Sequence, residues 1–458
     1  MAIDGEARAG AAVVGTSLLA PRYLVTTLGA VSLVFLAAFE QLAVTTVMVT
    51  VTTELDGRSW YSVAFSIALA SSVIGTVLGG LAADRRGPGA PLLAAVGVFG
   101  LGLLLAGLAP DIGTFVAARL LQGIGGGALT VTLYVLVAEV FDPVDRPRVF
   151  GAFAAAWVLP ALIGPLLAGA VADTVGWRWV FLGVIAVAAG ATALLLPALR
   201  THGRRSEVAE REPDSGRRLA LAVVVAASVV AIDLGGQAED VLGALVAGLG
   251  VLVTLLALRP LLPVGTLRAA RGLPAVIAMR GLMAAGFFLA EIYVPYLLQT
   301  RYDAKPWLAG LALTVGTIGW ASGSQVQGRL GARLPDTTAF RVGTALVLVG
   351  VAGQLAIAAL HVGPWAVPLL WVAGGAGMGL AYPRVSTAVL AASAEDERGR
   401  NSAAATMGDT VSSATWIALG GLAFTAIGGL GSDAAFPAAF GLATLAAAGA
   451  TLVARRTA

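Results

Sequence analysis

The sequence predicts an all-α membrane protein, and three observations lead to this fold class. First, 58% of the 458 residues are hydrophobic and only 12% are charged, whereas soluble domains carry roughly 25% charged residues. Second, the mean hydropathy is +0.88, and apolar runs near the length of a bilayer crossing recur along the whole chain. Third, these runs are continuous rather than alternating, which argues against a membrane β-barrel.

Fourteen apolar runs bounded by charged and turn residues are predicted to be membrane-spanning helices. Many of the 59 glycines lie inside them, and small residues allow membrane helices to pack closely. The runs cover 23–51, 60–83, 91–109, 113–138, 149–172, 179–199, 219–234, 241–258, 273–299, 307–328, 342–360, 365–391, 402–428 and 435–454.

The chain is expected to divide into two six-helix halves, joined by a basic linker and an extra hairpin. The hairpin is expected to turn at Gly235-Gly236-Gln237, with Asp233, Glu239 and Asp240 around the turn. Its two runs are just long enough to span, so we expect them to cross the membrane rather than to lie on its surface. The predicted segments are a lead 1–21, an N-terminal bundle 22–199, the linker 200–218, the hairpin 219–258, a C-terminal bundle 259–454 and a tail 455–458.

The distribution of arginine and lysine over the loops predicts the orientation. With the N-terminus inside, 22 of the 29 basic residues lie in cytoplasmic segments, four lie in outer loops and three lie within spans. Positive charge gathers on the cytoplasmic side of membrane proteins. We therefore expect a multi-pass protein of the cell (inner) membrane with both termini in the cytoplasm. The stretch 11–20 is interpreted as a cytoplasmic or interfacial lead-in rather than a signal peptide.

The composition also excludes several kinds of chemistry. The chain has no cysteine, so disulfides and thiol catalysis are excluded. Its two histidines, His202 and His361, are isolated, and no Gly-rich loop leads into a Lys-Ser/Thr phosphate cradle. We expect no enzyme activity, no metal and no cofactor beyond a proton gradient. The basic pI of about 9.5 is attributed to arginines on one side of a bilayer, not to nucleic-acid binding.

The segment Gly80–Gly89 (GLAADRRGPG) is predicted to be a short polar loop between the second and third spans. Gly80 gives a flat helix surface, and Gly87 relieves a tight turn. Asp84 is placed to interact with the positive N-terminal end of a neighbouring helix, and Arg85 with carboxylates or lipid phosphates. The two halves of the chain show a weak internal sequence repeat. Ser324–Gly331 aligns with this loop, and Gly374–Gly379 resembles Gly123–Gly127 of the fourth span.

Two further motifs lie inside the fourth and fifth spans. Arg119-x-x-Gln122-Gly123 places an arginine within a helix, which costs about 3 kcal/mol and normally requires a cavity and a partner; the alternative is that Arg119 extends to the nearby outer interface. In the fifth span, Gly164-Pro165-x-x-Ala168-Gly169 combines a helix-bending proline with small residues that permit close packing.

Together these segments resemble the major facilitator superfamily. Gly80-x-x-x-Asp84-Arg85-x-Gly87 is similar to the loop after its second helix, and the fourth-span motif is similar to R-x-x-Q-G. The fifth-span motif is similar to the G-P-x-x-G-G signature of its antiporter branch, with Ala168 in place of one glycine. With the extra hairpin, essentially the whole chain resembles the drug:proton antiporters with 14 transmembrane helices.

The resemblance implies a fold and several residue roles. The fold is two pseudo-symmetric six-helix bundles plus an extra central two-helix hairpin. The loop holds the two halves together on the cytoplasmic side, although Pro88 and Gly89 stand where the family usually has basic residues. Arg119 takes part in proton transfer. The residues expected to act as a conformational gate are Gly80, Asp84, Arg85, Gly87, Gly164, Pro165 and Gly169.

Three carboxylates inside spans are candidates for proton coupling. Glu40 lies in the first span beside Gln41, where the family commonly has an aspartate. Glu291 follows Arg280 by eleven residues, about 16 Å along the same helix face, too far for a direct pair but near enough to line one pathway. Asp409 belongs to a polar stripe of the thirteenth span. Burial in low dielectric favours a protonated carboxyl, which can then exchange its proton for a substrate. Structural pairing or helix–helix hydrogen bonding is the alternative role for these three groups.

The expected function is proton-coupled export of amphiphilic, hydrophobic or cationic compounds by alternating access around a midplane site. The expected partners are a small amphiphilic molecule or lipid, protons and membrane lipids, and the protein is expected to be a monomer. Three alternatives stay open: export of a lipid or cell-envelope component on the same scaffold, nutrient import by symport, and a receptor or intramembrane enzyme that transports nothing.

Overall fold

Fourteen long α-helices run in alternating directions through the part of the chain that the computed structural model describes. The described residues are 20–142, 145–202, 215–238, 241–394 and 397–457, and they contain no strand. The helices are α1 (Pro21–Glu54), α2 (Tyr61–Arg86), α3 (Gly89–Leu108), α4 (Ile112–Val140), α5 (Arg146–Thr174), α6 (Arg178–His202), α7 (Ser215–Gln237), α8 (Val241–Leu258), α9 (Leu273–Arg301), α10 (Pro306–Leu330), α11 (Asp336–Leu360), α12 (Ala366–Ala391), α13 (Arg398–Ala426) and α14 (Ala435–Val453).

Each of the fourteen predicted apolar runs has its helix, which confirms the all-helical fold class. Within the described residues, 12 helices are long and apolar enough to cross a membrane; α10 and α13 are not among them. Both carry polar side chains. On α10, which packs against α5 and α12, Ser322, Gln325 and Arg329 are exposed, whereas on α13, which packs against α2, α7 and α9, Asp409 and Ser413 are buried. That all fourteen helices cross the membrane stays a prediction.

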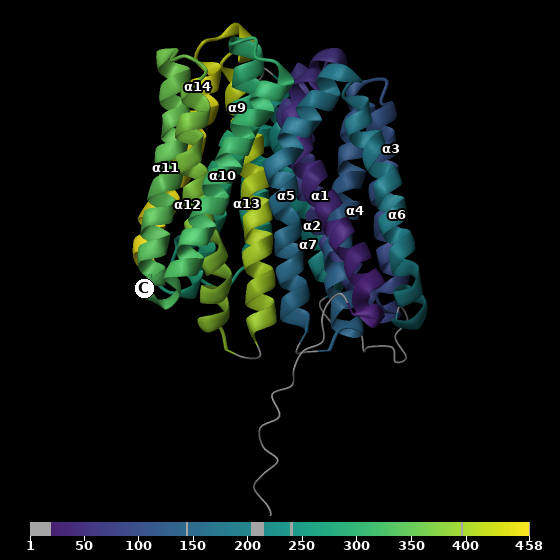
Figure 1. The fold of residues 1–458 in the computed structure, drawn as a ribbon. Coiled ribbons are helices and arrows are strands. Elements are labelled where there is room, and N and C mark those ends of the chain that lie inside the picture. The colour runs from purple at the N-terminus through teal and green to yellow at the C-terminus, as the bar shows by residue number, and fades with distance from the viewer. Residues whose placement is uncertain (1–19, 143–144, 203–214, 239–240, 395–396, 458) are drawn as a thin grey trace, which may run out of the picture.

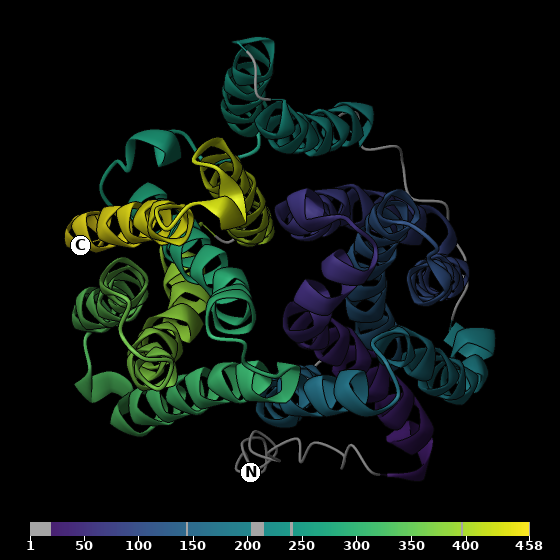
Figure 2. The ribbon, with the colours of Figure 1, turned by 90° about the horizontal axis from the view of Figure 1, so that it is seen from above.

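Two six-helix bundles with the same internal arrangement stand side by side (Figures 1 and 2). In the first bundle, α1 packs on α5 and α6, and α4 packs on α2 and α3. In the second, α9 packs on α13 and α14, and α12 packs on α10 and α11. The interface between the bundles repeats this symmetry, because α2 meets α13 and α10 meets α5. The expected pseudo-symmetric pair of bundles is therefore confirmed.

Glycines set the closest helix crossing of each bundle. A Cβ on Gly127 of α4 would clash with the Ser72 carbonyl of α2, and a Cβ on Gly379 of α12 would clash with the Trp320 carbonyl of α10. The sequence similarity between Gly123–Gly127 and Gly374–Gly379 thus corresponds to a structural repeat, since both segments contain a glycine at a close helix crossing. Small residues have this role in membrane helices because they let backbones approach each other.

Valine at Gly127 or Gly379 is expected to reduce sharply the yield of folded protein. The new side chain would push two backbones apart, and overpacking a tight contact costs typically about 1–3 kcal/mol, occasionally more. The measurement is the fraction of protein that elutes as a single species in mild detergent, together with its melting temperature. Gly97→Ala in α3 is the matched control, because nothing lies within 4 Å of a Cβ built there. A Gly127→Val protein with unchanged melting temperature would contradict this packing argument.

The hairpin of α7 and α8 lies outside both bundles, at the junction between α2 and α13 (Figure 2). Both of its helices are apolar enough to cross a membrane. The predicted turn at Gly235–Gln237 is wrong, since these residues belong to the last turn of α7. The glycines serve close packing instead: a Cβ on Gly236 would lie 3.0 Å from the Cα of Leu422 in α13. Glu239 and Asp240, like the lead 1–19 and most of the linker, fall outside the described residues.

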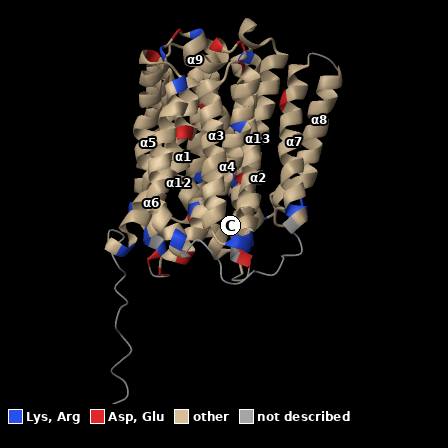
Figure 3. Ribbon diagram, turned by 90° about the vertical axis from the view of Figure 1, so that its right-hand side faces the viewer, with Lys and Arg blue, Asp and Glu red and all other residues tan. Residues whose placement is uncertain are grey.

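Charged residues gather at the two ends of the helices, and few lie between (Figure 3). At one end, the exposed Asp111 caps α4, because its carboxylate accepts hydrogen bonds from the Thr114 amide and hydroxyl, both at 2.9 Å. These bonds hold the pKa of Asp111 below its ordinary value. The few charges along the middle of the bundles are the candidate functional groups.

Candidate functional site

Glu40 and Arg119 form a buried ion pair inside the first bundle. Arg119 Nη1 donates to Glu40 Oε1 and to Gln122 Oε1, and Arg119 Nε donates to the Ala64 carbonyl at 3.2 Å. The side chains of Arg119 and Glu40 are only 6% and 9% exposed. Arg119 therefore connects α4 to both α1 and α2, rather than extending to the outer interface. Gln41 is exposed and does not join this pair.

A second buried ion pair lies inside the other bundle. Arg280 of α9 donates to Asp409 Oδ2 of α13 through Nε at 3.2 Å and through Nη2 at 3.1 Å. Tyr382 of α12 completes the cluster: its hydroxyl donates to Asp409 Oδ2, it accepts from Arg280 Nη2 at 3.2 Å, and the guanidinium lies 4.7 Å from the ring centroid. Three helices thus meet at one carboxylate, and sequence reasoning did not single out Tyr382.

The two pairs differ in depth along the helices. Arg119 is the eighth residue of α4, which begins at the end of the molecule that carries the α1–α2 and α9–α10 loops. Arg280 is the eighth residue of α9, which begins at the opposite end. With a rise of about 1.5 Å per residue, each arginine lies about 10 Å from its own end. The pairs therefore occupy opposite halves of the membrane depth.

Glu291 stands apart from both pairs. It makes no hydrogen bond or ion pair with any other residue that the structure describes. The structure does not bring it to Arg280, because Asp409 and Tyr382 already hold that guanidinium. Glu291 is thus the one predicted coupling carboxylate, among the described residues, that has no cation beside it.

The predicted loop 80–89 is mostly helix. α2 continues through Arg86 and α3 begins at Gly89, so only Gly87 and Pro88 lie between them. The expectation of a ten-residue loop is wrong because charged residues at a helix end remain helical when their side chains reach water. Asp84, Arg85 and Arg86 are exposed in the last turn of α2. Gly87 has a φ of 77°, which confirms the tight turn that needs glycine.

The fifth-span motif lies against the other bundle. A Cβ on Gly310 of α10 would clash with the Pro165 carbonyl, and a Cβ on Gly169 would lie 2.7 Å from the Cα of Trp307. Gly164 faces the first helix instead, where a Cβ would lie 3.5 Å from the Phe39 ring. This proline-containing segment therefore contacts both α1 and the opposite bundle.

The two bundles meet tightly at the end that carries the α1–α2 and α9–α10 loops. Tyr61 of α2 donates its hydroxyl hydrogen to the Ile292 carbonyl of α9, and its ring stacks on Tyr296 with centroids 4.2 Å apart. Gln299 of α9 donates to the Thr46 carbonyl of α1 at 3.1 Å. Farther from this end, α5 and α10 border a cavity of about 380 Å³, lined by Leu162, Ile318, Ala321, Ser322, Gln325, Val326 and Arg329.

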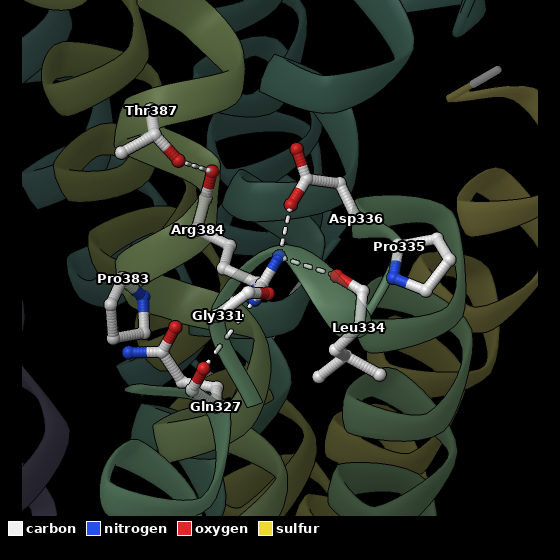
Figure 4. A pocket seen from close by; sticks show the side chains of 8 residues that line it. All are labelled: Gln327, Gly331, Leu334, Pro335, Asp336, Pro383, Arg384 and Thr387. Atoms are coloured by element: carbon white, nitrogen blue, oxygen red, sulfur yellow. Dashed lines mark hydrogen bonds and ion pairs between the residues drawn. The ribbon is translucent and has the colours of Figure 1, made fainter. Parts of the chain in front are cut away.

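A polar cavity of about 580 Å³ lies at the opposite end of the second bundle, around Arg384 of α12 (Figure 4). Arg384 Nη1 donates to Asp336 Oδ1 at 2.6 Å and to the Leu334 carbonyl at 2.8 Å, and Nη2 donates to the carbonyls of Gln327 and Gly331. The arginine therefore holds the α10–α11 connection in place. Both terminal nitrogens of Arg384 already donate to protein oxygens, so we assign this cavity a structural role.

Comparison with known proteins decides the family. Residues 30–417 match the sequence profile described as Major Facilitator Superfamily. The chain belongs to the major facilitator superfamily.

Relatives of this major facilitator transporter include "Multidrug resistance protein 3" of Bacillus subtilis (strain 168), 26% identical over 308 residues, which are 64% of this chain and 59% of the relative. Another is the "Acurin A biosynthesis cluster MFS-type transporter" of Aspergillus aculeatus, 30% identical over 173 residues, which are 38% of this chain and 31% of the relative. The chain thus spans about a third to three fifths of the length of these curated relatives.

Solved structures share the major facilitator fold at low sequence identity. A peptide transporter POT in complex with sulfate matches with a TM-score of 0.67 and 15% identity, covering 94% of each chain. A D-xylose–proton symporter matches with a TM-score of 0.65 and 14% identity, covering 93% of this chain and 96% of that one. At such identities the likeness concerns the fold alone.

Proposed function

We propose that this major facilitator protein is a proton-coupled antiporter with fourteen membrane-spanning helices, which exports amphiphilic, hydrophobic or cationic compounds. It works as a monomer in the cell (inner) membrane with both termini in the cytoplasm, and the proton gradient alone supplies the energy. The proposal rests mainly on one observation: each bundle buries a carboxylate against its own arginine, Glu40 with Arg119 and Asp409 with Arg280.

These pairs support proton coupling for an electrostatic reason. A carboxylate in a low-dielectric interior needs a cation, a proton or strong hydrogen-bond donors to offset its desolvation. When the bundles rock against each other, a shift that separates an arginine from its carboxylate favours proton uptake by the carboxylate. A cationic substrate can replace the proton in the same place. Glu291, which lacks a cation, is a third group of this kind.

The conformation supports alternating access. The bundles are in contact through Tyr61, Tyr296 and Gln299 at the end with the α1–α2 loop. With the N-terminus in the cytoplasm, this closed end faces outward, and the protein is ready to accept cargo from the inside. The segment Gly164–Gly169 at the α5–α10 contact, and the α2–α3 turn with Gly80, Asp84, Arg85 and Gly87, are proposed to act as gates between this state and its outward-open counterpart.

The name of the Bacillus relative favours a multidrug cargo. The α5–α10 cavity fits an amphiphile, because apolar side chains line it together with Ser322, Gln325 and Arg329. A lipid or envelope-component exporter is the first alternative, because the same cavity accepts an acyl chain. Proton-coupled nutrient import is the second, since one structural neighbour bears the name D-xylose–proton symporter.

Reconstituted transport distinguishes these functions. Proteoliposomes with an imposed pH gradient would be tested with a panel of lipophilic cations, neutral drugs, fluorescent phospholipids and sugars, while an internal dye records proton movement. An antiporter is expected to move protons opposite to a lipophilic cation. Proton movement together with a sugar would establish symport, and exclusive competition by phospholipid would establish lipid export. Ligand binding without proton movement for any compound would contradict antiport and indicate a receptor.

A further inference from the structure

Asp233 is a buried acid that lies outside both ion pairs. It is the only carboxylate on the described helices α7 and α8, and it lies one turn before the end of α7 with 3% of its surface exposed. A carboxylate is costly to bury inside a membrane protein and normally marks a functional position. The sequence placed Asp233 just before the expected hairpin turn at Gly235, whereas the structure places it against both bundles.

Two serines of α2 are the hydrogen-bonding partners of Asp233. Ser62 donates to Oδ1 at 3.1 Å, and Ser66 donates to Oδ2. No lysine or arginine among the described residues forms an ion pair with this carboxylate. The other titratable groups nearby are Tyr293 of α9, with Tyr61 and Arg58 just before the serines. Helix α8 has no titratable residue, and the nearest on α13 is Asp409, twelve residues from the contact at Gly421.

The same turn of α7 also contacts the second bundle. The Gly236 carbonyl accepts a hydrogen bond from Thr425 Oγ1 of α13 at 3.0 Å. A Cβ on Gly421 of α13 would clash with Ser62 Oγ and lie 3.4 Å from Asp233 Oδ1. The end of α7 is therefore bonded to α2 of one bundle and to α13 of the other, at the end where the bundles are closed.

We propose that Asp233 is a proton-binding residue of the hairpin and that its protonation weakens the contact between α7 and α2, which opens this end of the transporter. Both serines donate to the carboxylate, so the contact is strongest when Asp233 is charged. A neutral carboxyl accepts these bonds more weakly. The inference rests on the alternating access of the proposed function, and it gives the extra hairpin a part in proton coupling.

Spin-label distances test this proposal directly, because the protein has no cysteine of its own. The pair Ser59→Cys and Ala238→Cys, at two exposed positions, reports the separation of α2 from α7. The pair Ser59→Cys and Lys305→Cys reports the opening between the bundles. Both pairs would be measured in proteoliposomes at pH 8 and pH 5, without substrate, in the otherwise unaltered protein and in Asp233→Asn, Asp233→Glu and Ser228→Ala. Ser228 is the matched control, since it lies on α7 but bonds Thr254 of α8 at 2.7 Å.

In the spin-labelled protein without a further substitution (the parent) and in Ser228→Ala, acidification is expected to lengthen both the α7–α2 distance and the distance between the bundles. Asp233→Asn is expected to show the long α7–α2 distance already at pH 8, with no further response to pH, and Asp233→Glu is expected to restore the response. If Asp233→Asn is not folded, Ser62→Ala with Ser66→Ala serves instead and is expected to lengthen the distance at pH 8. An Asp233→Asn protein with the parent distance and the parent pH response would overturn the proposal. If the α7–α2 distance lengthens on acidification as expected but the protein moves no solute, the proposed function is contradicted and this inference stands.

Discussion

Replacing Glu40 by Gln is expected to abolish export driven by a pH gradient while the folded protein still reaches the membrane. Glutamine keeps an oxygen that can accept from Arg119, and Arg119 retains its bonds to Gln122 and the Ala64 carbonyl. What is lost is the group that can carry a proton. The measurement is uptake by inverted vesicles, with exchange of substrate at equal pH on both sides to show that binding survives.

Substituting the partner Arg119 tests the same ion pair from its other side. Arg119→Met leaves Glu40 buried without its cation, and breaking a buried pair from one side costs about 3–5 kcal/mol. Because each single change leaves one buried charge without its partner, we expect Arg119→Met and Glu40→Gln both to be less stable than the unaltered protein, and the double variant to recover stability without recovering export. Glu139→Gln is the control, because it removes an exposed carboxylate from the same helix α4. Normal gradient-driven export by Glu40→Gln would remove this residue from the mechanism.

Replacing Asp409 by Asn is the second change with a large expected effect. Asp409 accepts hydrogen bonds from Arg280 and from Tyr382, so its loss removes the anion that holds α9, α12 and α13 together. We expect gradient-driven export to fall to background. Glu397→Gln is the matched control, because it removes a carboxylate from the start of α13 that pairs with Arg400 near the surface, where such pairs contribute at most about 1 kcal/mol.

Tyr382→Phe separates proton binding from structure at the same site. The variant keeps the ring beside Arg280 but removes a hydroxyl that favours the charged carboxylate. A hydrogen bond to a charged group is worth about 1.5–3 kcal/mol, so half-maximal export should move to higher pH by about one unit or more. An unchanged pH profile for Tyr382→Phe, with Asp409→Asn still fully active, would show that the cluster only supports the fold.

The sequence predicted the helices well because a bilayer imposes a simple rule. Every apolar run of sufficient length became a helix, with ends displaced by a few residues where polar side chains such as Asp336 extend a helix beyond the apolar run. The positions of the buried ionisable groups Glu40, Arg119 and Asp409 were also readable, since charge inside an apolar run is rare and has to be accommodated.

The hydrogen-bond and ion-pair partners of these groups could not be predicted from the sequence. Arg280 and Glu291 share a helix face, yet Arg280 bonds to residues that follow it by about a hundred positions or more, Tyr382 and Asp409. Asp233 was assigned to a turn because glycines follow it, and only the packing of α7 on α2 and α13 showed that those glycines permit a close contact. A one-dimensional pattern records spacing along a helix, but not which neighbouring helix faces it.

The sequence by itself determined that this chain is a bundle of membrane helices with ionisable groups inside, because hydrophobicity and helical period are local properties. Only the tertiary structure decided which charges pair, that each bundle neutralises its own carboxylate, and that the hairpin bonds to both bundles at their closed end. Those outcomes depend on contacts between distant segments, and the energy of a buried charge is set by whatever the fold places beside it.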